Sequence, residues 1–332
     1  MKRNLIIADY SSLQSPVTKD ILKILTNVNI SQYPDPLYSN LKKCIAKYCG
    51  ISSNNIAVGN GADDLIQLIT SVFGKRIVIP TPCFITYSLS AKTLRKKIKF
   101  INCIKKGRFK LPKIRLKKYD ILWIANPNNP LGEYLPIEEI LSKISGNGIT
   151  IIDEAYIEFT GKQKVSPHLL KKSGLIILRS FSKGWPLAGL RVGYVISNPA
   201  VIRQLENQRL LFPVNAVANT LVPILLEKNK LYQIEREIAR KTSLDFVKIF
   251  QNSGLRTSNS VTNFFCVQFQ NTIQAARFYR EISKQGVRIL PPNDKEFVGL
   301  PSNYLRICIP KIKNVSRMKA AIKKTLQTLK HR

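Results

Sequence analysis

The stretch Gly148-Ile-Thr-Ile-Ile-Asp-Glu-Ala-Tyr156 joins an apolar, strand-like run to polar side chains that follow it directly. Similar runs alternate with helix-like segments from about residue 55 to residue 200. The other runs are Ile56–Val58, Arg76–Ile79, Lys99–Ile101, Ile121–Ile124, Leu175–Leu178 and Val192–Ile196. Such alternation is typical of a mostly parallel sheet covered by helices on both faces. The sequence therefore predicts an α/β fold whose large domain is built on a mostly parallel, seven-stranded sheet.

Beyond about residue 225 the pattern changes to longer helices with fewer strands. The expected elements are a charged helix over Leu226–Asn252, a strand at Asn263–Gln268, a helix over Ile273–Gln285, a strand at Tyr304–Ile309 and a final amphipathic helix from Val315 to Leu329. We expect a smaller α+β domain made of residues 1–29 and 226–332, and a large domain of residues 30–225.

The charge of the chain is strongly positive, with 53 Lys and Arg against 20 Asp and Glu, a net charge of +33. Clustered cations can bind nucleic acid through its phosphates. Thirteen of them fall between Ala91 and Lys118, but they alternate with apolar residues and no series of aromatic side chains accompanies them. We therefore interpret them as solvated surface and do not expect a nucleic-acid partner; the positive field also attracts anionic ligands.

Cysteine and histidine usage points away from a metal site. The six cysteines are scattered without a Cys-x-x-Cys pair, and the chain has only two histidines, His168 and His331. The apolar runs are too short to cross a bilayer, and the apolar stretch of Met1–Asp9 breaks at Asp9 before a secretory core forms. The sequence predicts a cytosolic protein without a membrane span, whose acid and base chemistry depends on Lys, Tyr, Asp or Glu.

Polar motifs follow four of the predicted strands, where α/β proteins bind ligands. They are Gly59-Asn-Gly-Ala-Asp-Asp64, Asn126-Pro-Asn-Asn-Pro-Leu-Gly132, Asp153-Glu-Ala-Tyr156 and Ser180-Phe-Ser-Lys183. The first opens a helix whose free N–H groups can bind an anion. Each motif alone is more often a turn or a helix cap. Together, in this order, they predict a phosphate-binding site beside a lysine, a carboxylate and a phenol.

These motifs resemble those of the class I and II aminotransferases, which depend on pyridoxal 5′-phosphate. The resemblance is strongest to the histidinol-phosphate aminotransferase branch and its relative, threonine-phosphate decarboxylase. It runs from Tyr33-Pro-Asp-Pro36, through the four strand-end motifs, to Tyr304-Leu-Arg-Ile307. The resemblance implies the aspartate-aminotransferase fold.

The resemblance also implies roles for residues around the cofactor ring. Lys183 would form the Schiff base and later move the proton at the substrate α-carbon. Asp153 would pair with the pyridinium nitrogen and keep the ring an electron sink. Tyr156 and Asn129 would hydrogen-bond the ring hydroxyl oxygen, and Phe84 would stack on the ring.

The cofactor phosphate would be bound by six residues of this chain, with a seventh from a neighbouring subunit. The six are Gly61, Ala62, Asp63, Ser180, Ser182 and Arg191. Tyr33 would reach the phosphate of the neighbouring subunit, which implies a homodimer with shared sites.

At the substrate side, Arg306 matches the arginine that binds the substrate α-carboxylate in this family. Arg288 is a candidate for binding a substrate phosphate, although it lies two positions before the usual arginine and Leu290 occupies the expected place. Strand alternation would let Arg288 and Leu290 share a face; a non-phosphorylated substrate is the alternative. The segment Ala8–Pro16 replaces the family's Asn-Glu-Asn-Pro segment, which lines the substrate pocket.

The reaction implied is amino-group transfer between a small amino acid or amino phosphate and a 2-oxo acid. Decarboxylation of threonine phosphate is the alternative, because Tyr33–Tyr38 and Gly299–Arg306 resemble the decarboxylase, whereas Ser180–Lys183 and Leu187–Arg191 resemble the aminotransferase. A remote alternative is a basic nucleic-acid-binding protein on an enzyme scaffold. We favour the aminotransferase.

Overall fold

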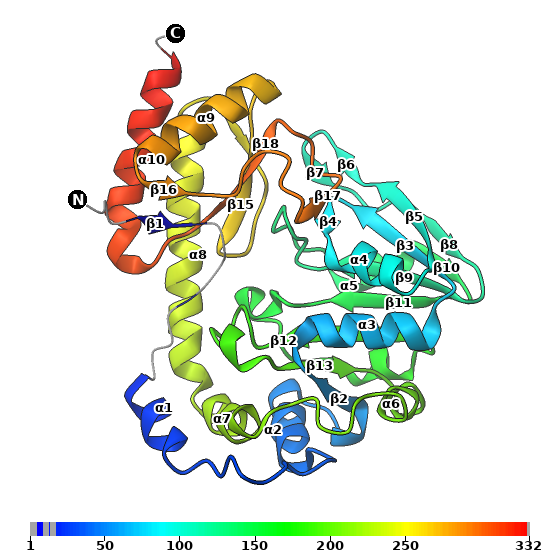
Figure 1. Cartoon of the computed structure of the whole chain (residues 1–332). Coiled ribbons are helices and arrows are strands. Elements are labelled where there is room, and N and C mark those ends of the chain that lie inside the picture. The colour runs from blue at the N-terminus through cyan, green and yellow to red at the C-terminus, as the bar shows by residue number, and fades with distance from the viewer. Residues whose placement is uncertain (1–4, 9–12, 14–17, 331–332) are drawn as a thin grey trace.

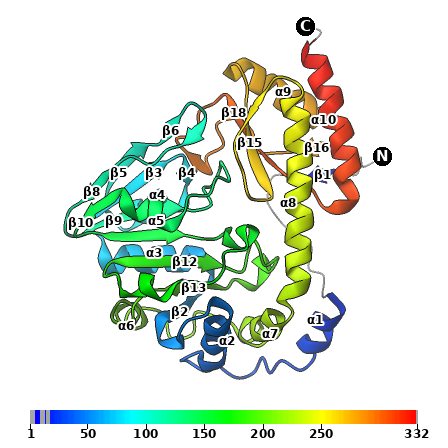
Figure 2. The same ribbon diagram turned by 180° about the vertical axis from the view of Figure 1, so that it is seen from behind.

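The computed structural model of the chain describes residues 5–8, 13 and 18–330 (Figure 1). Most of Met1–Asp9 and of Ala8–Pro16, two segments weighed in the sequence analysis, falls outside these residues. The molecule has a large α/β part and a smaller α+β part, and the long helix α8 (Asn229–Gln251) runs from one to the other along one side (Figures 1 and 2).

The large part is built on a seven-stranded sheet in which only the second strand is antiparallel to its neighbours. In spatial order the strands are β2 (Ile56–Gly59), β13 (Gly193–Ile196), β12 (Leu175–Ser180), β11 (Ile149–Asp153), β9 (Asp120–Ala125), β3 (Arg76–Thr81) and β5 (Lys97–Asn102). The predicted fold class, a mostly parallel seven-stranded sheet with helices, is confirmed.

Apart from the edge strand β5, both faces of this sheet are buried, because side chains alternate between two apolar layers. On β9, Ile121 and Trp123 pack into the layer under α3 (Gly61–Phe73), α4 (Thr86–Thr93) and α6 (Pro199–Glu206). Leu122 and Ile124 face the opposite layer with α5 (Ile137–Ser142). Further along that face, α2 (Ser39–Cys49) and α7 (Ala216–Glu227) cover β2 and β13.

The helix expected over Leu226–Asn252 is divided in the structure. α7 ends at Glu227 and α8 begins at Asn229, with Lys228 between them. α7 packs its apolar side against α2, whereas α8 leads away into the smaller part, so the chain changes direction here. α1 (Thr18–Leu25) contacts α7, and the proposed boundaries at residues 29 and 226 stay a prediction.

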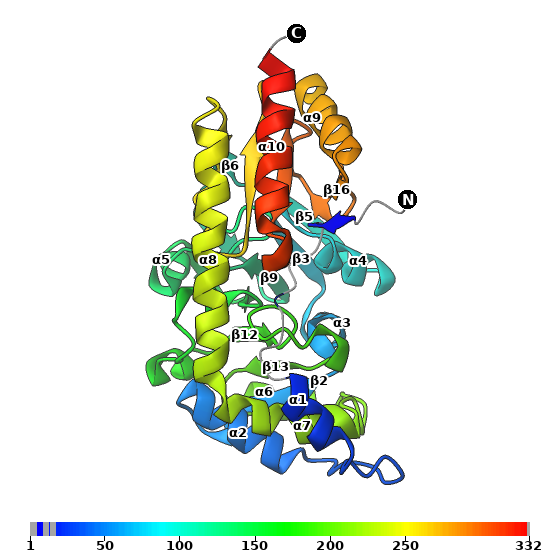
Figure 3. The ribbon, with the colours of Figure 1, turned by 90° about the vertical axis from the view of Figure 1, so that its left-hand side faces the viewer.

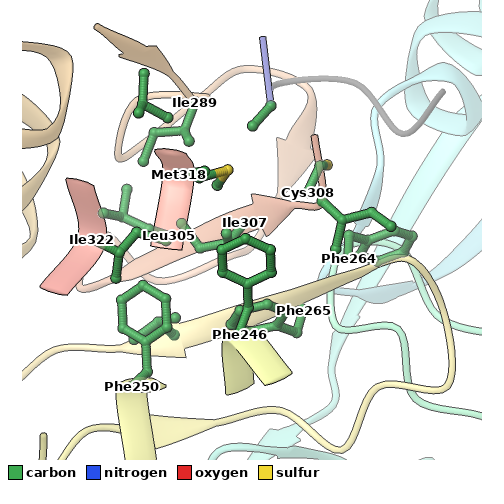
Figure 4. Close-up of a cluster of buried hydrophobic side chains, with 14 of the residues drawn as sticks. Phe246, Phe250, Phe264, Phe265, Ile289, Leu305, Ile307, Cys308, Met318 and Ile322 are labelled. Atoms are coloured by element: carbon green, nitrogen blue, oxygen red, sulfur yellow. The ribbon is translucent and has the colours of Figure 1, made fainter. Parts of the chain in front are cut away.

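The smaller part is a three-stranded antiparallel sheet backed by helices. The sheet contains β14 (Arg256–Thr257), β15 (Phe264–Gln268) and β18 (Tyr304–Cys308). α8, α9 (Thr272–Lys284) and α10 (Val315–Lys330) lie beside one another over it (Figure 3). Phenylalanines from α8 and β15 meet Met318 and Ile322 of α10 in a shared core (Figure 4). This core fixes β18, which carries Arg306, next to the large part.

Four short strand pairs complete the part of the fold that the structure describes. β1 (Ile6–Ile7) pairs in parallel with β16 (Val287–Arg288). β4 (Cys83–Phe84) pairs antiparallel with β17 (Phe297–Val298) and so ties the loop before β18 to the large sheet. The remaining pairs are β6 (Ile104–Lys105) with β7 (Arg108–Phe109), and β8 (Ile114–Leu116) with β10 (Ile144–Gly146).

Candidate active site

A cavity of about 190 Å³ opens where the sheet strands end and the two parts of the molecule meet. Its walls come from the start of α3, from β4, from the segments after β9, β11 and β12, and from β18. Eleven of the residues named by the sequence analysis line it: Ala62, Asp63, Phe84, Asn129, Asp153, Tyr156, Ser180, Ser182, Lys183, Arg191 and Arg306. Fold geometry thus gathers motifs that lie up to about 240 residues apart in the chain.

One end of the cavity is formed by the N-terminus of α3 and by Arg191. Helix α3 begins at Gly61, whose φ is 79°, a left-handed conformation that favours glycine. A Cβ at this position would lie 2.5 Å from Nη2 of Arg191. Gly61 therefore does not line the cavity itself but lets Arg191 pack over the helix terminus. Arg191 Nη2 also contacts Asp63 Oδ2 at 3.1 Å.

Hydroxyl groups complete this end. Ser180 closes β12, and its Oγ accepts a hydrogen bond from the N–H of Ser182 at 3.1 Å. Both serines line the cavity near the helix terminus and the guanidinium of Arg191. Free helix N–H groups, hydroxyls and a guanidinium are the donors that a phosphate group prefers, so this end fits the phosphate of pyridoxal phosphate.

The middle of the cavity contains Asp153, which is buried at the end of β11. Tyr87 donates its O–H to Asp153 Oδ2 at 2.5 Å, and the N–H of Ala155 donates to Oδ1 at 3.0 Å. Burial raises the pKa of Asp153 to about 6 in spite of these hydrogen bonds. Within the described residues no cation pairs with this carboxylate, so the site fits a protonated ring nitrogen as its partner.

Tyr87 was missed by the sequence analysis. It lines the cavity, is fully buried, and stacks on Trp123 with ring centroids 5.0 Å apart. Burial and the neighbouring Asp153 carboxylate raise the pKa of Tyr87 well above its ordinary value, so it stays a hydrogen-bond donor. Its sequence signal is only a second aromatic three residues after Phe84, which helical spacing in α4 explains equally well.

Lys183 follows β12 and extends toward the ring of Tyr156, with Nζ 5.7 Å from the ring centroid. Its amine has no hydrogen bond or ion pair with any residue that the structure describes. Tyr156 meets Phe264 edge to face at 4.9 Å. Asn129 is buried on the adjacent wall, and its Oδ1 has no partner in the described part of the chain. The amine of Lys183 and the amide of Asn129 both face the cavity, and the described residues leave part of their hydrogen-bonding capacity unused. A cofactor with an aldehyde and a polar ring substituent would use both groups.

Arg306 lies in the middle of β18 and is 4% exposed. Its guanidinium is stacked between Phe264, 4.0 Å from the ring centroid, and Phe297, 5.3 Å away. Nη2 lies 3.5 Å from the hydroxyl of Tyr156, whereas Nε has no partner among the described residues. No carboxylate in that part of the chain pairs with it. A buried guanidinium is costly without a counterion, so this wall is suited to an anionic group of a ligand.

Two candidate residues lie away from the cavity. Tyr33 is 82% exposed and stacks on Phe212, with centroids 4.6 Å apart. Arg288 is exposed on β16, which ends at this residue, whereas Leu290 is buried. Because the strand stops at Arg288, the alternation that would place both side chains on one face does not continue. Glu296, which the sequence analysis did not name, does line the cavity.

The described residues show no helix with the length and apolarity needed to span a membrane. Over the same residues, no group of three or more His, Cys, Asp or Glu side chains is placed to bind a metal ion.

Comparisons with known proteins agree with this geometry. The profile of the aminotransferase class I and II family matches residues 2–323. The chain is 34% identical to histidinol-phosphate aminotransferase 2 of Haemophilus influenzae over 309 residues, which are 90% of this chain and 83% of that protein.

Solved structures give the same picture of the fold. The histidinol-phosphate aminotransferase of Sinorhizobium meliloti, solved with pyridoxal-5′-phosphate, superposes with a TM-score of 0.84 at 22% identity, covering 98% of this chain and 92% of that one. The L-threonine-O-3-phosphate decarboxylase of Porphyromonas gingivalis gives 0.81 at 22% identity, covering 97% and 100%. At this identity the likeness concerns the fold, which both reaction types share.

Proposed function

The chain belongs to the class I and II aminotransferase family, and we propose that it transfers an amino group from an amino acid to a 2-oxo acid, with Lys183 and Arg306 as its central residues. Pyridoxal 5′-phosphate is the cofactor. The observation that carries the proposal is the buried guanidinium of Arg306, which lacks a carboxylate partner in the described residues and lines the same cavity as Lys183. An α-carboxylate bound there would bring the α-carbon of the substrate toward the lysine amine.

The residues proposed to bind the cofactor act on different parts of it. Arg191, Ser180, Ser182 and the N–H groups at the start of α3 hold the phosphate. When bound, the cofactor supplies a protonated ring that withdraws electrons from the substrate α-carbon. Asp153 keeps the ring nitrogen protonated, because a carboxylate beside it stabilises the positive charge.

Proton transfer at the α-carbon falls to Lys183. Its amine lines the cavity without an ion pair to any described residue, so it is placed to move the α-proton of a bound substrate. Tyr156 and Asn129 would hydrogen-bond the ring oxygen of the cofactor, and Phe84 would pack on its ring face. Arg306 fixes the carboxylate of the substrate in two places, which orients the bond to the α-proton.

We also propose that the enzyme is a homodimer in which Tyr33 reaches the neighbouring site. The support is the exposure of Tyr33 together with other large apolar side chains near it. These are Ile30, Leu37, Leu210, Leu211 and Phe212. Sedimentation measurements should give a dimer, and Tyr33→Ala should weaken cofactor binding. The cytosol is the proposed compartment, supported by six cysteines that are all free.

The cofactor assignment is tested by the colour of the protein. The purified holoenzyme should have a visible absorption band that borohydride abolishes, leaving the cofactor bonded to the peptide that contains Lys183. Lys183→Ala should lose this bond, and Lys172→Ala, a change at an exposed lysine just before β12, should keep it. A covalent adduct retained by Lys183→Ala would contradict the assignment.

The reaction type needs a separate experiment. The holoenzyme is incubated with amino acids, histidinol phosphate and threonine phosphate, each with and without 2-oxoglutarate. Glutamate formation that requires the 2-oxo acid supports the aminotransferase. Release of CO₂ from threonine phosphate without any 2-oxo acid would contradict it and indicate the decarboxylase.

A further inference from the structure

Six charged residues from the part of the chain that the structure describes line the cavity, and five of them have a defined partner or task. Asp63 pairs with Arg191. Asp153 accepts two hydrogen bonds. Lys183 and Arg306 bind the cofactor and the substrate carboxylate under the proposed function. The sixth is Glu296, whose carboxylate has no hydrogen bond or ion pair with any residue that the structure describes.

The backbone of Glu296 is held firmly, although its carboxylate has no partner among the described residues. Its N–H donates to Asp294 Oδ1 at 2.8 Å, and its carbonyl accepts from the N–H of Ile85 at 2.9 Å. The next residue, Phe297, pairs with Phe84 across β17 and β4. Glu296 is therefore placed by the same strand pair that places the ring-stacking candidate Phe84.

Glu296 is also close to the carboxylate-binding side. Phe297 packs against the guanidinium of Arg306, 5.3 Å from its ring centroid. The negative charge of Glu296 contributes to raising the pKa of Arg306, after the larger effects of its nearer neighbours. The two residues do not form an ion pair with each other. A substrate bound at Arg306 would thus meet a second, negative charge on the adjoining wall.

Among the described residues, the cavity lining offers no further positive charge for a distal phosphate. Arg191 belongs to the cofactor end, and Arg288, the candidate for that task, is exposed on β16 outside the cavity lining. The carboxylate of Glu296 would repel a phosphate dianion placed near it, whereas a cationic group there would form an ion pair with this carboxylate.

We propose that Glu296 determines substrate specificity by binding a positively charged group at the far end of the amino donor. The substrate class is an amino acid with an ammonium or guanidinium side chain, bound by its α-carboxylate at Arg306 and by its distal cation at Glu296. This inference rests on the proposed function, since Arg306 must hold the carboxylate.

The test uses pairs of donors that differ in the distal charge. Lysine and norleucine share a carbon chain, and only lysine ends in an ammonium group; ornithine and norvaline form a second pair. The first half-reaction of the holoenzyme is followed by loss of its visible band without a 2-oxo acid. We expect kcat/KM for lysine or ornithine to exceed that of the neutral partner by roughly ten- to a hundredfold, the worth of one charge-assisted hydrogen bond.

Variants separate recognition from general damage. Glu296→Gln should lower kcat/KM for the basic donors about tenfold, through KM, and change the neutral donors less than about twofold. Glu296→Lys should reverse the order in favour of O-phosphoserine over lysine. Glu138→Gln, the same change at an exposed position of α5, should leave every donor unchanged. Equal rates for charged and neutral donors, unaltered by Glu296→Gln, would overturn the proposal.

A binding measurement keeps the two proposals distinguishable. α-Methyl-lysine and α-methyl-norleucine have no α-proton, so their affinity for the holoenzyme, measured by calorimetry, does not depend on turnover. The proposed role of Glu296 predicts that the charged analogue binds more tightly than the neutral one, and that this difference in affinity is lost in Glu296→Gln. Equal affinities would refute the role of Glu296 even if transamination occurs. If no donor removes the visible band of the holoenzyme, the proposed function itself is refuted.

Discussion

The two ends of the cavity differ in how far the protein itself matches their charges. At the cofactor end, Asp63 faces Arg191, and Asp153 accepts hydrogen bonds from Tyr87 and from the backbone. At the substrate end, the Nε of Arg306 and the carboxylate of Glu296 have no partner in the described part of the chain. A preorganised site suits a cofactor that stays bound through the reaction. The unpaired charges at the substrate end gain partners only when a substrate of complementary charge binds.

The burial of these groups gives the difference a physical basis. Asp153 is enclosed by the sheet and by α4, and its raised pKa reflects the cost of an anion out of water. Arg306 is equally buried, but two aromatic rings cover its faces and leave its edge open to the cavity. Four substitutions compare the contributions of the two ends of the cavity to activity.

The largest effect should come from the cofactor end. Asp153→Asn removes the negative charge that stabilises the protonated ring, so kcat should fall about 10²- to 10³-fold. Steady-state kinetics with saturating cofactor measure it. Asp245→Asn, the same change at an exposed position of α8, is the control and should behave like the wild type. A fully active Asp153→Asn would remove Asp153 from the cofactor site.

At the substrate end, Arg306→Gln should raise KM about 100-fold for carboxylate-bearing donors, because the bidentate contact and its charge are lost. The cofactor band should be unaffected, which separates this variant from Asp153→Asn. Arg280→Gln, exposed on α9, serves as the matched control. An unchanged KM would show that the carboxylate binds elsewhere.

Tyr87→Phe should have a smaller, pH-dependent effect. The O–H of Tyr87 stabilises ionised Asp153, so its removal should raise the pKa of that carboxyl further above about 6. Protonated Asp153 cannot stabilise the positive charge of the ring. As the pH is lowered, the activity of the variant should therefore begin to fall at a higher pH than that of the wild type. We expect kcat/KM to fall about fivefold near pH 6 and less near pH 8. An acid limb at the wild-type position would contradict this contact.

The smallest effect is expected for Arg288→Ala. The side chain is exposed outside the cavity lining, so kcat/KM for every donor, phosphorylated or not, should change less than about twofold. A selective loss of phosphorylated donors would instead bring Arg288 into the substrate site and weaken the proposal for Glu296.

Most of the fold and the cofactor end could be predicted from the sequence because their signals are local. Each motif, such as Asp153-Glu-Ala-Tyr156, directly follows an apolar strand, and parallel strands bring their ends to one edge. The substrate end has no such signal. Arg288 and Leu290 look equivalent on a strand, yet β16 ends at Arg288 and leaves one exposed and the other buried.

The sequence by itself determined the α/β fold, the family and the set of polar residues at the strand ends, because periodicity and short motifs encode them within a few residues. The tertiary structure alone decided which distant side chains meet. Tyr87 reaches Asp153 across 66 residues of chain, and Glu296 enters the cavity only because β17 pairs with β4. Contacts of this kind depend on how elements pack in space, and no local pattern specifies that packing.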